Sequence, residues 1–247
     1  MNRRTMRGGM ALALAVALAM SGCGSNPTPA GGSGPTGSDT KPADATAALV
    51  KAAKKLQEKS FKATIKIGDS GTMTGVMDPQ QNVGEFTMDA AAEGTAIKTE
   101  MRIIDGTSYL RITMPGSDLP GMDGKTWRKM NAAGGKGTLG SFNATDTIKS
   151  LESATDVTWA GHDEVTGTID LAKAGQQLGV GAGDLAKITT KTIPFEAGFD
   201  GDGRLVRYSL TMPAVGSEKA TKMDMTYSDF GLPVKVAAPP ASEIAAS

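Results

Sequence analysis

The sequence has one cysteine and one histidine, Cys23 and His162, among its 247 residues. A single thiol cannot form an internal disulfide, and one histidine with one cysteine cannot supply the ligands of a usual zinc site. The serine motif G-x-S-x-G of many hydrolases is absent, and His162 lies in the polar segment AGHDEV without an identifiable catalytic partner. We therefore expect no enzymatic activity, no metal site and no cofactor, with His162 at the surface.

Long apolar runs are also scarce. The longest, Met10–Met20, has eleven residues and follows a segment that contains Arg3, Arg4 and Arg7. A membrane-spanning helix needs about 20 apolar residues, so this run is too short to cross a bilayer. A positively charged start followed by a short apolar stretch is typical of a secretory signal. We predict that residues 1–22 are a signal peptide.

The lone cysteine comes directly after this run. Met20-Ser21-Gly22-Cys23 resembles the bacterial lipobox. The resemblance implies cleavage before Cys23, a diacylglycerol with acyl chains such as palmitate on its sulfur, and an anchor on the extracytoplasmic face of the cell membrane. The alternative is an ordinary secretory leader with an incidental thiol. Residues 23–41 contain no large apolar side chain and predict a flexible Gly/Pro/Ser tether with a mean reach of about 20–25 Å. The folded domain is expected over residues 42–247.

Neither sign of charge dominates the chain. It has 26 basic and 26 acidic side chains, and loss of the three arginines in the leader would leave a net charge of −3. Nucleic-acid binding relies on clustered lysine and arginine, so we expect no nucleic-acid partner.

Hydrophobic periodicity predicts one helix followed by a series of strands. Residues 44–60 place Leu49, Ala53 and Leu56 at helical spacing, with Asp44 as the N-cap. After Ser60 the period changes to two, which is typical of strands with one wet face. Such runs occupy residues 61–67, 72–77, 85–90, 96–104, 108–114 and 126–130. Short turns between successive runs indicate an antiparallel meander.

The rest of the chain is less regular at first and then returns to strands. Residues 134–141 predict a loop, residues 143–156 a helix, and residues 170–178 and 183–189 short helices. Strands are predicted at residues 159–171, 193–199, 204–212, 221–230 and 233–240. Asp200-Gly201-Asp202-Gly203 superficially resembles a calcium loop, but Arg204 and Thr211 stand at the fifth and twelfth positions, where such a loop needs oxygen ligands and a glutamate. A hairpin turn explains the segment better.

These elements predict an α+β fold with about ten strands and three or four helices. A long antiparallel sheet with one polar face must curl and cover its apolar face. We expect a strongly curved antiparallel sheet wrapped around a few helices.

Several segments carry a family resemblance through their order along the chain. They are KSFKATIKI, DGTSYLRI, AGHDEVTGTIDL, GFDGDGRLVRYSL and YSDFGLPVKVAAPP. With the lipobox and the tether, they resemble actinobacterial lipoproteins of the LppX/LprG type, within the LolA/LolB-like lipid-carrier superfamily, over residues 44–244. The resemblance implies a half-open barrel with an apolar cavity between sheet and helices. It also implies that the cavity holds acyl chains while a lipid or lipoprotein crosses the envelope. Of the family's functional residues, only the role of Cys23 transfers to this sequence.

Methionine is frequent, with 14 residues, whereas aromatic residues make up only 4% of the chain. An unbranched, polarizable side chain conforms to ligands of different shape, but methionine also fills ordinary cores, and the residues alone leave both readings open. The resemblance favours a lined cavity. The candidate lining residues are Ile65, Ile67, Met73, Met77, Phe86, Met88, Ile97, Met101, Ile103, Met223 and Met225.

The leading functional hypothesis is a membrane-anchored lipoprotein that binds an acyl chain in an apolar cavity and carries it across the cell envelope. Its expected partners are a lipid or lipidated ligand, the cell membrane through the N-terminal anchor, and a component of envelope transport, and the protein is expected to be a monomer. The alternative is a non-enzymatic interaction module at the cell surface without a lipid ligand. An envelope enzyme that depends on His162 is the least favoured hypothesis.

Overall fold

In the computed structural model, Asp44 caps the first helix, as the sequence predicts. Its carboxylate accepts hydrogen bonds from the backbone N–H groups of Thr46 and Ala47, at 2.9 and 3.1 Å. These two donors would otherwise have no partner inside the helix. The helix buries Leu49 and Ala53 completely, so the predicted apolar side is the one that faces the core.

The structure describes residues 44–92, 94–117, 119, 121–130, 144–175, 178, 182–185, 187–214 and 219–245. The predicted signal peptide, Cys23, the tether and the predicted loop at 134–141 lie outside these residues. Residues Thr40–Ser247 form one compact unit. Because this unit has its own buried core, we expect it to fold without the preceding residues.

The described residues contain four α-helices, two short 3-10 helices and eleven strands. The helices are α1 (Ala45–Lys54), η1 (Lys55–Gln57), α2 (Ala144–Glu152), α3 (Leu171–Ala174), α4 (Ala182–Leu185) and η2 (Ala241–Glu243). The strands are β1 (Phe61–Ile67), β2 (Gly71–Asp78), β3 (Val83–Ala92), β4 (Thr95–Ile104), β5 (Thr107–Thr113), β6 (Arg128–Met130), β7 (Ala154–Trp159), β8 (Glu164–Asp170), β9 (Thr192–Phe199), β10 (Leu205–Met212) and β11 (Thr221–Ser228).

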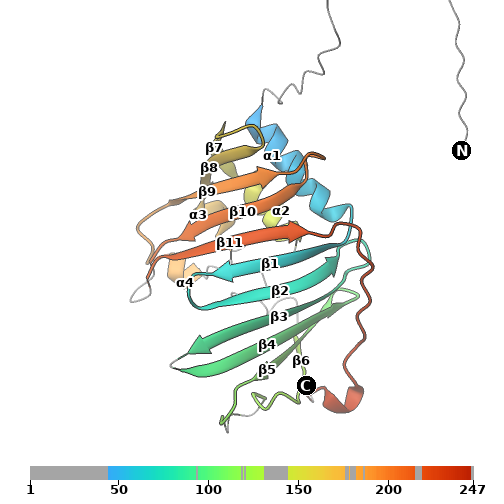
Figure 1. The fold of residues 1–247 in the computed structure, drawn as a ribbon. Coiled ribbons are helices and arrows are strands. Elements are labelled where there is room, and N and C mark those ends of the chain that lie inside the picture. Colours follow the sequence, from blue (N-terminus) through green and yellow to red (C-terminus); the bar gives the residue numbers. More distant parts are fainter. Residues whose placement is uncertain are drawn as a thin grey trace, which may run out of the picture. The chain divides into compact units, whose positions relative to one another are not determined.

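All eleven strands form a single antiparallel sheet in the order β6-β5-β4-β3-β2-β1-β11-β10-β9-β8-β7. The sheet therefore consists of two meanders, β1–β6 and β7–β11, joined at the centre by the pairing of β1 with β11. Among the described residues the outermost strands, β6 and β7, are at opposite ends of this order, so the sheet is open. Figure 1 shows the strand direction turning steadily across it, as expected from the twist of β-strands.

One face of the sheet, called the inner face here, packs against the helices. It carries alternate residues of each strand, such as Phe61, Ala63 and Ile65 on β1, which are all at most 3% exposed. Helix α1 contacts β7 and β10, while α3 contacts β8. In Figure 1 the labelled helices α1, α2 and α3 lie behind the strands of the second meander. The opposite face, called the outer face, carries the intervening polar residues, such as Lys62 and Lys66.

Two glycines on the inner face mark the junction of β2 and β3. Gly75 lies opposite Phe86, and Gly84 lies opposite Met77. A side chain at Gly75 would collide with the carbonyl oxygen of Glu85 and the ring of Phe86, and one at Gly84 would come within 2.8 Å of the carbonyl oxygen of Val76. Glycine inside a strand marks close approach or a bend. Because both glycines remove bulk from the inner face, the sheet can bend toward that face at this junction, which we call the β2–β3 bend.

Most of the predicted strands are confirmed, with ends that differ by a few residues. The predicted run at 61–67 is β1, and Asp200–Gly203 forms the β9–β10 hairpin turn, in which the Asp200 carboxylate accepts hydrogen bonds from the N–H groups of Asp202 and Arg204. Burial alone would raise the pKa of Asp200, but these hydrogen bonds and the Arg204 guanidinium together lower it.

Three predictions are wrong. Residues 159–171, assigned to one strand, contain the end of β7, a turn at 160–163 and then β8. Residues 154–156, assigned to a helix, begin strand β7, where Asp156 has a φ of 54° and the register shifts between Thr155 and Thr158. This bulge breaks the alternation of apolar and polar side chains, and so hides the strand from a periodicity analysis. Residues 233–240 form no strand. This segment contains three prolines, which cannot donate to a sheet ladder.

The C-terminal segment from Asp229 to Ala245, called the strap here, instead crosses from the end of β11 toward β6 (Figure 1). It meets the sheet edge next to β6, where Trp127 forms a parallel bridge with Ile244. The only regular element in the strap is η2. No helix in the described ranges is both long enough and apolar enough to cross a membrane.

Candidate functional site

The register places all eleven predicted lining residues on the inner face of the sheet. Ile65 lies between Met73 on β2 and Met225 on β11, and Met73 in turn lies opposite Met88 on β3. Farther along, Phe86 lies opposite Met101 on β4. The chain thus builds a continuous apolar stripe of methionine, isoleucine and phenylalanine across β11, β1, β2, β3 and β4.

Burial divides these residues into two groups. Six are at most 8% exposed and belong to the packed core: Ile65, Met73, Met77, Phe86, Met223 and Met225. Four are half-buried and pack against the edge of that core: Ile67, Met88, Met101 and Ile103. Ile97 is half-buried and lies outside the core cluster. Ordinary core packing therefore accounts for the six buried residues, whereas the half-buried residues retain accessible apolar surface.

Three further residues extend the accessible stripe beyond the predicted set. Leu110 lies opposite Met101, Ile112 lies opposite Thr99, and Met130 lies opposite Ser108. All three are half-buried on the inner face. Leu110 and Ile112 alternate with polar residues in the predicted strand at 108–114, so this signal was present in the sequence. We call the accessible stripe on β3–β6 the apolar shelf, made of Met88, Ile97, Met101, Ile103, Leu110, Ile112 and Met130.

Buried hydroxyl groups lie at the opposite end of the inner face, where β10 and β11 meet α2. Burial raises the pKa of Tyr227 to about 12 and that of Tyr208 well beyond its usual range. The Tyr208 hydroxyl has no hydrogen-bond partner among the described residues. The nearby Ser150 hydroxyl partly offsets this rise in the pKa of Tyr208. The Ser150 hydroxyl itself donates a hydrogen bond to the carbonyl of Thr147 at 2.8 Å. This end of the inner face is closed by packing.

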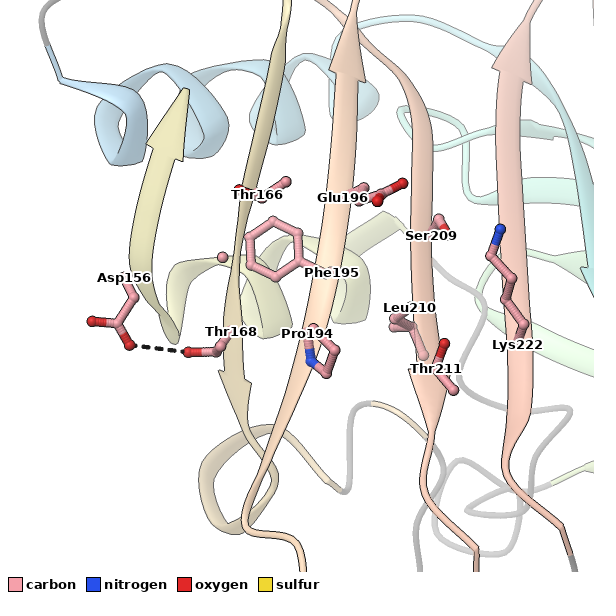
Figure 2. Close-up of a pocket in the computed structure, with 11 residues that line it drawn as sticks. Asp156, Thr166, Thr168, Pro194, Phe195, Glu196, Ser209, Leu210, Thr211 and Lys222 are labelled. Atoms are coloured by element: carbon pink, nitrogen blue, oxygen red, sulfur yellow. Dashed lines mark hydrogen bonds between the residues drawn. The ribbon is translucent and has the colours of Figure 1, made fainter. Parts of the chain in front are cut away.

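The outer face of the second meander has a shallow polar groove of about 400 Å³ (Figure 2). Its lining residues are Asp156, Thr166, Gly167, Thr168, Pro194, Phe195, Glu196, Ser209, Leu210, Thr211 and Lys222. The Thr168 hydroxyl lies 3.3 Å from an Asp156 carboxylate oxygen, and Lys222 forms an ion pair with Asp224 at 2.9 Å. Hydroxyl, carboxylate and ammonium groups suit a polar partner.

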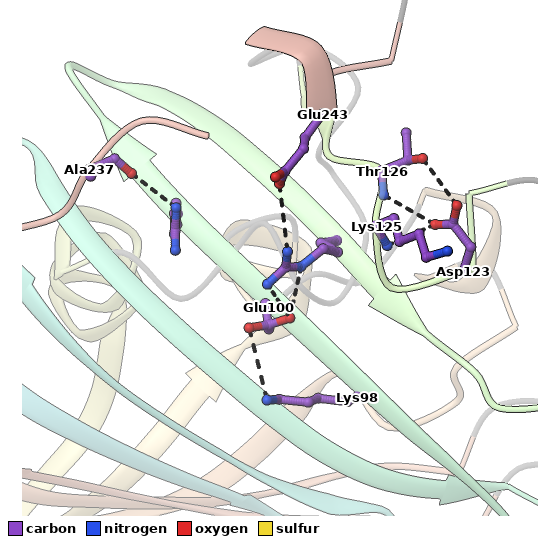
Figure 3. Close-up of polar contacts among 9 residues, drawn as sticks. Lys98, Glu100, Asp123, Lys125, Thr126, Ala237 and Glu243 are labelled. Carbon is purple, nitrogen blue, oxygen red and sulfur yellow. Dashed lines mark hydrogen bonds and ion pairs between the residues drawn. The ribbon is translucent and has the colours of Figure 1, made fainter. Parts of the chain in front are cut away.

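A cluster of charged residues on the outer face positions the strap. Figure 3 shows the contact between Glu100 and Lys98. Arg111 on β5 lies 2.9 Å from Glu100 and 3.9 Å from Glu243 of the strap. Nearby, Asp123 accepts hydrogen bonds from the N–H groups of Lys125 and Thr126, and these bonds lower its pKa. The turn that they stabilise leads directly into Trp127.

Groups that carry metal or acid–base chemistry are dispersed in the part of the chain that the structure describes. Within it, no three His, Cys, Asp or Glu side chains come together in an arrangement that could hold a metal ion. His162 is exposed in the turn between β7 and β8, which confirms its predicted surface position. Cys23 lies outside the described residues.

Comparison of the sequence with models of known protein families finds no match, and neither does a search of curated proteins.

Proposed function

We propose that this protein is a lipid-anchored carrier that binds an acyl chain on the apolar shelf and carries it across the cell envelope. In this proposal Cys23 holds a permanent covalent anchor, while the shelf holds an exchangeable guest. The sheet would act as the half-open barrel of the LppX/LprG-type lipoproteins that the sequence resembles. The observation that carries the proposal is the accessible apolar surface of Met88, Met101 and Ile103 on the same face as the buried core.

The size of the hydrophobic effect supports a carrier without catalytic groups. Burying an acyl chain contributes about 0.8 kcal/mol per methylene, so ten methylenes would contribute about 8 kcal/mol before the costs of association. Methionine side chains can adjust to chains of different length and branching because they are unbranched and flexible. The shelf therefore has the chemistry to compete with a membrane for a single acyl chain.

Two adjacent residues of β4 provide a matched test. Ile103 and Ile104 are both half-buried, but Ile103 belongs to the shelf and Ile104 to the outer face. The Thr40–Ser247 unit and its Ile103→Asp and Ile104→Asp variants would be incubated with phospholipid vesicles and examined by native mass spectrometry. We expect bound lipid in the parent and in Ile104→Asp, and none in Ile103→Asp. A parent that stays free of lipid would refute the proposal, as would equal binding by both variants.

The outer groove favours a second function, that of a cell-surface interaction module without a lipid ligand. Glu196 and Thr211 are exposed in the groove, and the Glu196 side chain forms no hydrogen bond or ion pair within the described ranges. This function predicts that Glu196→Lys abolishes cross-linking to a reproducible envelope partner and that Ile103→Asp has no effect on it. The reverse pattern would exclude it.

A further inference from the structure

The strap is fixed at its start by contacts with the beginning of β1. The N–H of Gly231 donates to the carbonyl of Ser60 at 2.7 Å, and the Ser60 hydroxyl donates to the carbonyl of Leu232 at 2.5 Å. Phe230 adds an aromatic contact with Phe61, at 6.4 Å between ring centroids, and a stacking contact with an arginine of the β9–β10 turn. Because Ser60 is only 8% exposed, this first attachment is shielded from water.

The far end of the strap is held by a second, more polar attachment, which we call the latch. The backbone N–H of Trp127 donates to the carbonyl of Glu243 at 2.7 Å, and the backbone carbonyl of Trp127 accepts from the N–H of Ala245 at 2.8 Å. Trp127 is 1% exposed. The guanidinium carbons of Arg102 and Arg111 lie over its indole ring, 4.8 and 4.5 Å from the ring centroid.

The charged part of the latch is open to solvent. The Glu243 side chain is 43% exposed and lies 3.9 Å from Arg111, and Arg102 donates a single hydrogen bond of 3.2 Å to the carbonyl of Ala237. Ion pairs in such positions contribute little to stability. These charged contacts are therefore the most easily broken part of the latch, next to the shielded backbone hydrogen bonds of Trp127.

The strap passes across the β2–β3 bend. The residue that ends β11, Ser228, lies in one row of cross-strand partners with Lys62, Val76, Glu85, Arg102, Tyr109 and Lys129. This row runs from the centre of the sheet to β6 and crosses the pairing of β2 with β3, near Gly75 and Gly84. The first attachment thus lies on one side of the bend and the latch on the other.

The length of the strap allows the latch to open while the first attachment holds. Six strand-to-strand steps separate β11 from β6, which is about 29 Å at the usual spacing. Residues 229–243 could extend to about 48 Å. The strap is therefore longer than the distance it spans. The contacts at its two ends, and not its length, determine whether the β3–β6 half is held in place.

We infer that the strap regulates access to the apolar shelf: when latched it holds the β3–β6 half of the sheet in the arrangement that leaves the shelf accessible, and when released it lets this half curl further inward about the β2–β3 bend and cover the shelf. The identity of the guest rests on the proposed function. The movement itself does not depend on it, because the bend, the strap and the latch are properties of the protein alone.

The movement can be measured without any lipid. The Thr40–Ser247 unit has no cysteine, because Cys23 precedes it. Spin labels at Thr211→Cys on β10 and Ala96→Cys on β4, both exposed positions on the outer face, would report the distance across the bend by electron double resonance. Five strand steps place their backbones about 24 Å apart in the latched state.

Two changes release the latch in different ways. The double variant Arg102→Met, Arg111→Met keeps aliphatic packing on Trp127 but removes the charges, and a chain that ends at Val236 lacks the latch segment altogether. The matched control is Arg207→Met, which breaks an outer-face ion pair with Glu164 of 2.6 Å that does not involve the strap. We expect a second, different distance population in both latch variants and an unchanged distribution in the control. The same distribution in all four proteins would overturn the inference.

A second measurement links the movement to access. Association of a fluorescent fatty acid, cis-parinaric acid, would be followed by stopped flow. If release lowers the fraction of molecules with an accessible shelf from nearly all to about 10%, association slows about tenfold. A parent protein that binds no fatty acid would refute the proposed function. The distance measurement alone would then test whether the strap controls the position of the β3–β6 half. Binding by the parent at the same rate as both latch variants would refute the strap's control of access.

Discussion

The pair Met73 and Met88 provides the sharpest test of the division between packed core and accessible shelf. The two side chains are cross-strand partners on the inner face of β2 and β3. Met73 is 2% exposed and belongs to the core, whereas Met88 is half-buried at its edge. They have the same chemistry and differ mainly in their surroundings, so truncation of each to alanine isolates the effect of burial.

The expected costs follow from that difference. Replacing a fully buried methionine by alanine removes its transfer free energy and leaves a cavity, which together cost about 2–5 kcal/mol. We expect about 3 kcal/mol for Met73→Ala. Met88 is already partly solvated and leaves an open depression rather than a closed cavity, so we expect about 1 kcal/mol for Met88→Ala. For a domain of this size, each kcal/mol lowers Tm by about 2–4 °C.

Urea denaturation and calorimetry of the Thr40–Ser247 unit would measure both values, with fatty-acid affinity determined in parallel. Met73→Ala should lower Tm by about 6–12 °C with little effect on the affinity of the folded protein. Met88→Ala should lower Tm by only about 2–4 °C and weaken fatty-acid binding. Equal destabilisation by the two substitutions would mean that the β3 end of the inner face is closed core, and the reasoning that places a guest there would fail.

Four other predictions concern single positions. Asp44→Ala should destabilise the fold by about 1 kcal/mol in urea denaturation because two N–H groups of α1 lose their acceptor, and Gly75→Ala should cost about 1–3 kcal/mol because its methyl group meets backbone and the Phe86 ring. The folded-state pKa of Asp200 is lowered, so its contribution to stability is present above the unfolded value near 3.9 and is lost as pH falls through the folded value. Asp200→Asn should therefore lower the free energy of unfolding at pH 7 and flatten its dependence on pH below about pH 4. The free energy of unfolding of the parent and of the variant would be measured as the pH is lowered, and parallel curves for the two proteins would contradict this prediction. Tyr208→Phe should leave Tm unchanged or raise it, because the hydroxyl lacks a partner, whereas a loss of about 1 kcal/mol would mean that it bonds to Ser150.

The sequence predicts the regular parts of this fold well. Strand β1 has the residues of the predicted run because Phe61, Ala63 and Ile65 alternate strictly with polar residues. The inner-face set could be predicted for the same reason, since a period of two fixes which side chains share a face. Periodicity fails at Asp156, where a bulge inverts the pattern, and in the strap, where residues 233–240 contain three prolines.

The division of the inner face into core and shelf could not be predicted from the sequence. Met73 and Met88 have the same local pattern, and only the packing of distant segments decides which of them belongs to the core. The latch is likewise a long-range feature: Arg102, Trp127 and Glu243 are brought together by the order of the strands, and no local spacing connects them.

The pairing of β1 with β11 at the centre of the sheet also determines the order of assembly. The first meander can form as soon as residues 61–130 have been synthesised, since each of its strands pairs with the next. The central pair must wait for Thr221–Ser228, near the end of the chain. Until then β1 is an unpaired edge with an apolar face, which is prone to association with other chains. Closing a loop of this length is slow compared with forming a hairpin, so the nascent chain is most vulnerable to aggregation at the strand that later becomes its most protected one.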